Sequence, residues 1–283
     1  MRFAIVTPSY YVDLEHCRWL CETVDRYVPE HVAHVLIVDR ADLHLFASLA
    51  SRRRRVVTKE EVLAGRFVQV PFARRWWIGP RGLPVRGWIL QQLTKLCAHE
   101  VVDEQVLLFV DSGAFFVRPY DPATTLRDGL VPLFREHGAF FLGDPSAKWQ
   151  RIAARLLGIR PPPSYDVGYV KTLVPWRRDN LAKLHEHLAR VAGRPSIEAL
   201  CRTLTLSEYY LYGMYCDIIL GDRAGHYATD VTETLSHWTE ERLDVAGLQK
   251  LRASLAPQQV LVMVNEKSRT SLDTIRQVFR APA

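Results

Sequence analysis

The stretch VLLFVDSG, residues 106–113, decides the fold. Its first five residues form the most continuous apolar run in the chain, which predicts a central β-strand buried on both faces. Asp111, Ser112 and Gly113 then end that strand with turn-forming residues. In open α/β sheets, ligands bind in the crevice outside the carboxyl ends of the strands, so this strand end is the first place to look for a site.

The chain before this strand alternates between strand and helix patterns. Residues 3–6 (FAIV) form a short apolar run, and Pro8 cannot continue a central strand. Asp13 is the predicted N-cap of a helix whose apolar residues follow helical spacing. A second apolar run, residues 34–38 (HVLIV), closes on Asp39. This β–α–β order predicts a mostly parallel sheet with helices on its faces.

A helix predicted over residues 88–99 carries two different faces. One face is an apolar stripe, and the other carries Gln92 and Lys95, flanked by Gln91. Two interpretations of the polar face remain open, because it can be a solvated surface or can meet the charge of a ligand.

The second half of the chain is less regular. Strands are predicted over residues 139–142 and 259–264, and helices over residues 149–157 and 178–191 and from residue 208 onward. Ser207 is the predicted N-cap of the last helix. No linker is long enough to divide the chain, so we expect one elaborated α/β domain over residues 1–283.

Charge and cysteine content limit the function classes. The net charge is +6 and the pI is about 9.1, with the densest run at residues 52–55 (RRRR), a balance that suits anionic ligands. That run is interpreted first as a solvated face, with nucleic acid or anionic lipid as alternatives. The five cysteines predict reduced core thiols, since Cys17 and Cys21 lack the second ligand pair of a zinc site.

The chain start predicts where the protein resides. No stretch of about 18 apolar residues lacks charges, and the first residues turn polar before a secretory signal could fit. We therefore expect a cytoplasmic protein without a transmembrane segment, with peripheral membrane contact left open.

Four segments carry a family resemblance: residues 4–10 (AIVTPSY), 86–96 (RGWILQQLTKL), 109–119 (FVDSGAFFVRP) and 207–213 (SEYYLYG). Together they resemble an uncharacterised, DUF6492-like family of bacterial glycosyltransferases of the GT-A type. The resemblance implies a Rossmann-like nucleotide-binding sheet and transfer of a sugar from a nucleotide-sugar donor, with a UDP-sugar favoured, to a small-molecule or glycan acceptor. It also implies a nucleotide-sugar-binding half over residues 1–125 and an acceptor-binding half over residues 126–283.

The sequence departs from that family at the strand-end motif. The usual Asp-Ser-Asp, a form of the Asp-x-Asp that holds Mn²⁺ or Mg²⁺ on the donor diphosphate, becomes Asp111-Ser112-Gly113. One carboxylate is missing, so the metal ligands implied by the resemblance reduce to Asp111 and His237, and we expect weak or no metal dependence.

The resemblance and the strand ends together predict the site residues. For donor binding they are Thr7, Pro8, Ser9, Asp39, Arg86, Gln91, Gln92, Lys95, Asp111 and Ser112. Glu208, at a helix start, is the candidate general base of a transferase, with inversion slightly favoured, and Asp166 is the second candidate. Glu208 can equally be a carboxylate that only stabilises the helix dipole.

Two other classes of protein remain. A GT-A-like protein that has lost catalytic activity would bind a nucleotide or glycan without transferring a sugar. Gly113 is consistent with this alternative, because the second aspartate of the motif is missing. A basic nucleic-acid-binding protein would use the arginine-rich segments, but the sequence contains no recognised binding motif, so nucleic acid is not the expected partner.

Overall fold

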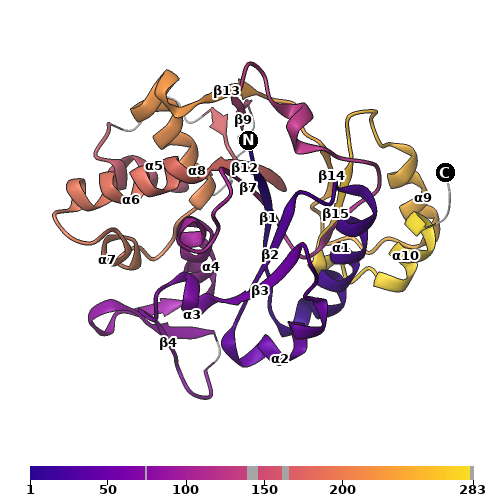
Figure 1. Cartoon of the computed structure of the whole chain (residues 1–283), viewed down its shortest axis with the longest axis horizontal. Helices are drawn as coiled ribbons and strands as arrows, with labels where there is room; N and C mark the ends of the chain where they lie inside the picture. The colour runs from indigo at the N-terminus through magenta and orange to yellow at the C-terminus, as the bar shows by residue number, and fades with distance from the viewer. Residues whose placement is uncertain (74, 139–145, 161–165, 281–283) are drawn as a thin grey trace.

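A five-stranded sheet forms the centre of the computed structural model, which describes residues 1–73, 75–138, 146–160 and 166–280 (Figure 1). Its strand order is β12-β7-β1-β2-β3. The four strands from β7 to β3 are parallel, and β12 pairs antiparallel with β7. The strands are β1 (Phe3–Pro8), β2 (Ala33–Val38), β3 (Arg54–Thr58), β7 (Val106–Val110) and β12 (Leu173–Arg177).

Alternate residues of the strands face two different helical layers, as the two-residue period of a strand requires. Ala4 and Val6 pack in a cluster with helices α4 (Gly87–Cys97), α6 (Arg178–Ala192) and α8 (Glu208–Met214). Phe3 and Ile5 pack on the opposite face with helix α1 (Leu14–Tyr27). Figure 1 shows α4 to α8 on one side of the sheet and α1, α9 and α10 on the other.

Short elements complete a single mixed α/β domain around this sheet. Three small sheets join β4, β5 and β6; β14, β15 and β8; and β13 and β9, while β10 pairs with β11. The helices are α2 (Leu43–Phe46), α3 (Lys59–Val62), α5 (Ser146–Leu157), α7 (Ser196–Cys201), α9 (Val245–Ala253) and α10 (Leu272–Arg280). The strands are β4 (Val68–Gln69), β5 (Trp76–Ile78), β6 (Pro84–Arg86), β8 (Ala114–Phe116), β9 (Val131–Phe134), β10 (Glu136–His137), β11 (Val167–Gly168), β13 (His226–Thr229), β14 (Thr234–His237) and β15 (Leu261–Val264).

The main predicted elements are confirmed. The strand at residues 106–110, the helix at residues 178–191 and the mostly parallel sheet are present, whereas the strand predicted at residues 139–142 lies outside the described residues. The prediction that Pro8 cannot continue the strand is wrong, since Pro8 takes the last position of β1. The next ladder bond to Ile37 comes from the N–H of Ser9, at 2.9 Å.

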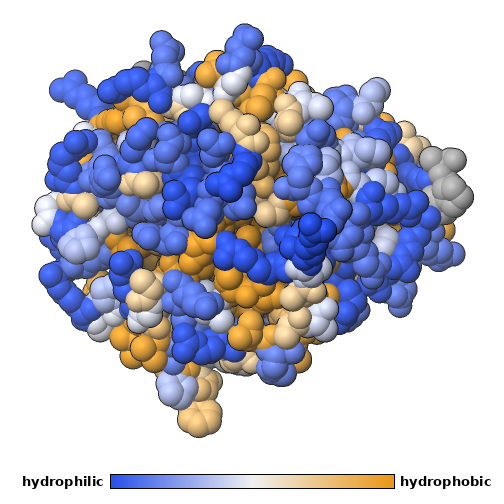
Figure 2. All heavy atoms as spheres, viewed as in Figure 1, coloured by the Kyte–Doolittle hydropathy of each residue, from blue (hydrophilic) through white to orange (hydrophobic). Residues whose placement is uncertain are grey.

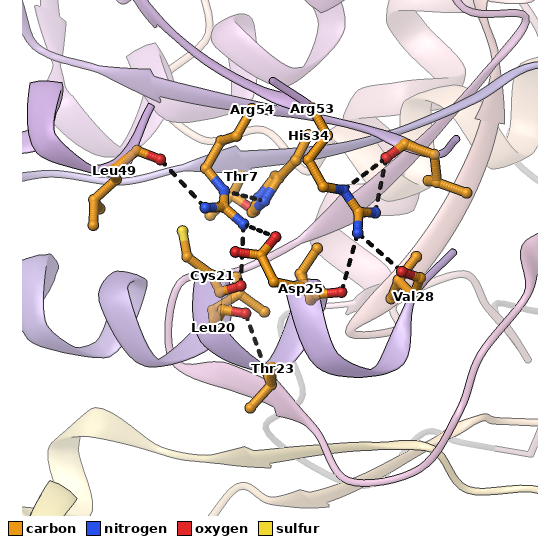
Figure 3. Close-up of polar contacts among 12 residues, drawn as sticks. Thr7, Leu20, Cys21, Thr23, Asp25, Val28, His34, Leu49, Arg53 and Arg54 are labelled. Atoms are coloured by element: carbon orange, nitrogen blue, oxygen red, sulfur yellow. Dashed lines mark hydrogen bonds and ion pairs between the residues drawn. The ribbon is translucent and has the colours of Figure 1, made fainter. Parts of the chain in front are cut away.

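The interpretation of the arginine run as a solvated face is wrong for Arg54, which is buried in β3. Its guanidinium donates to Nδ1 of His34 at 2.9 Å and to Oδ1 of Asp25 at 2.6 Å (Figure 3). It also donates to the carbonyls of Cys21 and Leu49. A buried guanidinium needs such a set of acceptors, because burying an unpaired charge is costly.

Arg53 stabilises the C-terminal end of helix α1. Its guanidinium donates to the carbonyls of Val24, Val28, Pro29 and Val32, and the bond to Val28 is seen in Figure 3. The last carbonyls of a helix have no intrahelical partner, so a basic side chain there stabilises the end. Two of the four consecutive arginines are thus structural and are not presented to an external anion.

Two further sequence expectations can be compared with the structure. All five cysteines are buried and none forms a disulfide. Within the described ranges, no helix combines the length and apolar character needed to cross a membrane.

Candidate active site

The strand order creates a crevice between β1 and β7. From β1 the chain adds β2 and β3 on one side, and β7 then joins the other side, so the ends of β1 and β7 form a topological switch point. Ser112, directly after β7, donates from Oγ to Oδ2 of Asp13 at 3.0 Å. Asp13 lies in the connection after β1. This bond joins the two strand ends on either side of the crevice.

A pocket of about 530 Å³ opens at this edge of the sheet. Ends of β1 and β2, the strand β5 and the start of α4 build its walls. Five residues predicted to bind a donor line it: Pro8, Ser9, Asp39, Arg86 and Gln91. The other lining residues are Tyr10, Asp13, Lys59, Arg75, Trp76, Trp77, Gly87, Trp88 and Leu90.

Charge in this pocket is distributed unevenly. Asp39 forms an ion pair with Lys59, with Oδ1 and Nζ 2.9 Å apart. Arg86 is exposed and its guanidinium carbon lies 5.4 Å from the centre of the Trp76 ring, a cation–π arrangement. Arg75 is also exposed. The pocket therefore offers two guanidinium groups to an anionic ligand.

Asp13 is the lining carboxyl with the most altered proton affinity. Burial, together with the neighbouring carboxylates of Glu266 and Asp111, raises the pKa of Asp13 to about 7, against the opposing effect of the hydrogen bond from Ser112. A carboxyl with a pKa near neutrality can accept or release a proton at the working pH. The sequence pattern predicts only an N-cap at Asp13, yet the Asp13 side chain makes no capping bond to α1.

Behind the pocket, Lys95 joins two predicted site residues. Its buried Nζ lies 3.1 Å from Oδ1 of Asp111 and 3.1 Å from Oε1 of Glu208, and it donates to the hydroxyl of Tyr209 at 2.8 Å. Burial opposes the charged form of Lys95, but Asp111, Tyr209 and Glu208 together hold its pKa well above the ordinary value.

Glu208 is closed off from the pocket. It is only 1% exposed, and the amide of Gln92 donates to its carboxylate when the NH₂ group faces it. Burial raises the pKa of Glu208 against the opposing effect of Lys95, and the like charge of Asp111 adds a smaller increase. Lys95 has two carboxylate neighbours, whereas Glu208 has one neighbouring cation. Attraction by opposite charge therefore outweighs burial in setting the pKa of Lys95, and burial outweighs attraction in setting the pKa of Glu208.

The polar face of α4 is therefore not solvated. Gln92 and Lys95 are both buried against the start of α8. Thr7 also lies away from the pocket, because its buried hydroxyl bonds to Nε2 of His34 at 3.2 Å. The structure thus divides these predicted site residues into a pocket lining and a cluster of Lys95, Asp111, Glu208 and Gln92, in which Asp111 alone is partly exposed.

Two predicted residues lie apart from this cluster. Asp166 is exposed and directly precedes β11. His237 ends β14, where its Nε2 is 2.9 Å from the carbonyl oxygen of Glu241 and 3.1 Å from Oγ1 of Thr239. Its strand partner is Val264, whose carbonyl oxygen would lie 3.9 Å from a Cβ on Gly113, so His237 belongs to a neighbouring strand end.

The residues at the strand-end motif do not fit a divalent ion held by the protein alone. Asp111 already pairs with Lys95, and Gly113 supplies no oxygen from a side chain. Among the residues that the structure describes, no group of three or more His, Cys, Asp or Glu side chains could hold a metal. Mg²⁺ and Mn²⁺ need about six oxygen ligands, most of which would have to come from a substrate and water.

Comparison with known proteins gives a family but no activity. No curated protein matches the chain. The family match covers residues 4–277, nearly the whole chain, including both strand ends, α4 and the buried Lys95 cluster. The chain therefore belongs to the family of unknown function DUF6492.

Proposed function

We propose that this protein is a glycosyltransferase with a GT-A-like, Rossmann-like nucleotide-binding sheet, which moves a sugar from a nucleotide-sugar donor to a small-molecule or glycan acceptor. One observation carries the proposal. The pocket at the carboxyl ends of β1 and β2, beside the β1–β7 switch point, joins the strand-end residues Ser9 and Asp39 to the guanidinium groups of Arg75 and Arg86. Nucleotides bind at this position in open α/β sheets. The four motif segments point to the same class of donor.

The two guanidinium groups would meet the charge of the donor diphosphate. Arginine binds phosphate oxygens through paired, charge-assisted hydrogen bonds. When the bond from the anomeric carbon to the leaving phosphate oxygen breaks, negative charge grows on the diphosphate, and fixed cations stabilise it there. This arrangement accounts for a strand-end motif with a single carboxylate and predicts activity that depends little on added metal.

Glu208 acts in this scheme as a positioning residue. It holds Lys95, which in turn holds Asp111 at the end of β7. Asp13 is the pocket carboxyl suited to be the general base, because Asp39 is already neutralised by Lys59. The acceptor oxygen attacks the anomeric carbon as its proton passes to Asp13, and the nucleoside diphosphate leaves.

A donor-binding experiment tests the proposal. Melting temperatures are measured with UDP, GDP and CMP, with their common sugar conjugates, and with nucleotide-free buffer, each with Mn²⁺ or with EDTA. A ligand that binds only the native state raises the melting temperature by mass action. We expect one class of nucleotide sugar to do so in EDTA and to be slowly hydrolysed. The proposal would be overturned if no nucleotide and no sugar conjugate raised the melting temperature.

The second candidate is a GT-A-like binding protein without transfer activity. Gly113 favours it, because the motif has lost a carboxylate. The same panel separates the two, since a binding protein would give a thermal shift without any hydrolysis of the donor and without any transfer.

A further inference from the structure

The small sheet of β4, β5 and β6 and its connecting turn expose several large apolar side chains to solvent. Val68 is 65% exposed, Ile78 is 45% exposed, Trp76 is 39% exposed and Phe72 is fully exposed. Figure 1 shows this segment projecting from the lower edge of the molecule, and Figure 2 shows hydrophobic atoms at the same projecting point. We call Val68, Phe72, Trp76 and Ile78 the apolar tip.

Phe72 is held outward at a cost to the backbone. Its φ is 63°, in the left-handed region that side chains other than glycine rarely occupy. The turn around it is fixed by hydrogen bonds from the N–H of Ala73 to the carbonyl of Val70 and from the N–H of Trp76 to the carbonyl of Ala73. A large apolar residue with this backbone and no buried area contributes nothing to folding, so its use lies outside the domain.

Positive charge lies beside the apolar tip. Between Val62 and His99 the sequence contains five arginines and no aspartate or glutamate, while its one lysine, Lys95, is buried and Arg81 pairs with Glu198. Arg75 and Arg86, beside Trp76, are exposed and form no ion pair within the described part of the chain. An apolar projection within a cationic segment matches the interface of a bilayer that contains anionic lipids, where apolar side chains enter and arginines meet phosphates.

We propose that the apolar tip docks this protein on the surface of an anionic membrane. Phe72, Val68 and Ile78 enter the headgroup region, and Trp76 lies at the interface, where its ring is partly apolar and partly polar. The positive charge of the neighbouring arginines attracts the anionic lipid surface, an effect that does not require their guanidinium groups to leave the pocket. The chemistry of the tip separates this partner from nucleic acid, which would gain nothing from exposed Val and Ile side chains.

The docked position would also define the acceptor. Trp76 belongs both to the apolar tip and to the lining of the pocket, so docking brings the mouth of the pocket to the lipid surface. If the proposed function holds, on which this step rests, the acceptor is a hydroxyl of a lipid headgroup or of a lipid-linked glycan.

Vesicle co-sedimentation tests docking without any sugar donor. The full chain is mixed with phosphatidylcholine vesicles that contain either no anionic lipid or about 30 mol% phosphatidylglycerol. That fraction gives the vesicles a negative surface potential like that of a cellular leaflet. The test variant is Phe72→Asn with Val68→Thr, because Asn tolerates a positive φ and Thr keeps the shape of Val. The matched control is Leu204→Asn, since Leu204 is 91% exposed outside the tip.

We expect binding to the anionic vesicles that weakens at high salt. The double variant should lose about tenfold or more in partitioning, since burying one large apolar side chain alone is worth that much. The control should bind as the unchanged chain does. Equal binding by the double variant, or no binding to anionic vesicles, would overturn the proposal. Self-association of the chain through the tip, seen as sedimentation without vesicles, would overturn it as well.

A donor-hydrolysis assay with vesicles keeps the two proposals separate. Docking without donor hydrolysis would support the membrane proposal and contradict the proposed transferase activity. Donor hydrolysis without docking would support the transferase and contradict the membrane proposal.

Discussion

The ammonium group of Lys95 lies 3.1 Å from Oε1 of Glu208, and both side chains are buried. Lys95 comes from helix α4 and Glu208 begins helix α8, so the pair joins the two halves of the chain. The same ammonium group is 3.1 Å from Oδ1 of Asp111 at the end of β7. One buried cation therefore fixes the position of the strand-end motif relative to both helices.

Replacement of Lys95 tests this arrangement. Lys95→Met should lower the free energy of unfolding by about 3–5 kcal/mol, because removing one partner leaves an uncompensated carboxylate in the interior. Urea denaturation at neutral pH measures the change. The double variant Lys95→Met with Glu208→Gln should recover much of the loss, since it removes the orphaned charge together with its partner.

An exposed ion pair serves as the control for Lys95. Lys183 pairs with Asp179 one helical turn away at 3.3 Å, with both side chains about half exposed. Lys183→Met should change the free energy of unfolding by less than about 1 kcal/mol, as is usual for surface pairs. A similar small change for Lys95→Met would show that the buried pair does not hold the motif in place.

The burial of this cluster marks a limit of prediction from the sequence. Helical spacing correctly placed Gln92 and Lys95 on one side of α4, away from its apolar stripe. It could not reveal that α8 packs over that side, because α8 follows more than a hundred residues later in the chain. A polar helix face is solvated or buried according to its long-range contacts, which no local pattern contains.

Two arginines of the pocket are predicted to bind the donor diphosphate. Arg75→Ala or Arg86→Ala should weaken donor affinity by about 1–3 kcal/mol, the usual cost of losing a charge-assisted hydrogen bond. Calorimetry with the nucleotide that gives the thermal shift measures the change. Arg155→Ala is the control, because Arg155 is exposed on α5 and does not line the pocket. Unchanged donor affinity in both pocket variants would show that Arg75 and Arg86 do not bind the diphosphate.

The altered pKa of Asp13 predicts how stability depends on pH. The folded-state pKa of about 7 lies above the ordinary value of 3.8, so the folded chain holds a proton that the unfolded chain has already lost between these values. The contribution of Asp13 to stability is therefore fully present below about pH 4 and is lost as the pH rises towards 7. Asp13→Asn should flatten this part of the curve of melting temperature against pH.

Asp103 provides the comparison for that experiment. Its side chain is 84% exposed, so Asp103→Asn should leave the curve unchanged. Under the proposed mechanism, the rate of transfer by the unchanged chain should also rise as the pH passes about 7, because a general base must be ionised. An unchanged stability curve in Asp13→Asn would place the proton on another group.

The sequence was informative about strand ends and less so about which side chains reach the pocket. The rule that ligands lie beyond the carboxyl ends of strands predicts Ser9 and Asp39, and a fixed cation at a helix start predicts Arg86; all three line the pocket. Asp13 was read only as a helix cap, although an acid in the short connection after β1 must lie near the same edge. Thr7 was included because of its neighbours, but the alternation of a strand turns its hydroxyl to His34.

The last prediction concerns Gly113, which stands where the Asp-x-Asp motif implied by the resemblance would have aspartate. The backbone at Gly113 does not have a positive φ, and a Cβ there would meet only the carbonyl oxygen of Val264, at 3.9 Å. Glycine is therefore not required by the fold at this position. Gly113→Asp should be tolerated, with a melting temperature close to that of the unchanged chain.

The added carboxylate should create a better cation site. Gly113→Asp should strengthen Mn²⁺ binding by about tenfold or more, because the number of charged ligands sets the affinity of such sites. Calorimetry without donor measures it, and Gly113→Asn controls for the added side chain without its charge. The gain will remain limited while Lys95 competes for Asp111 at 3.1 Å. Tight stoichiometric Mn²⁺ binding by the unchanged chain would mean that its ligands lie elsewhere, and would contradict a site that relies on fixed cations.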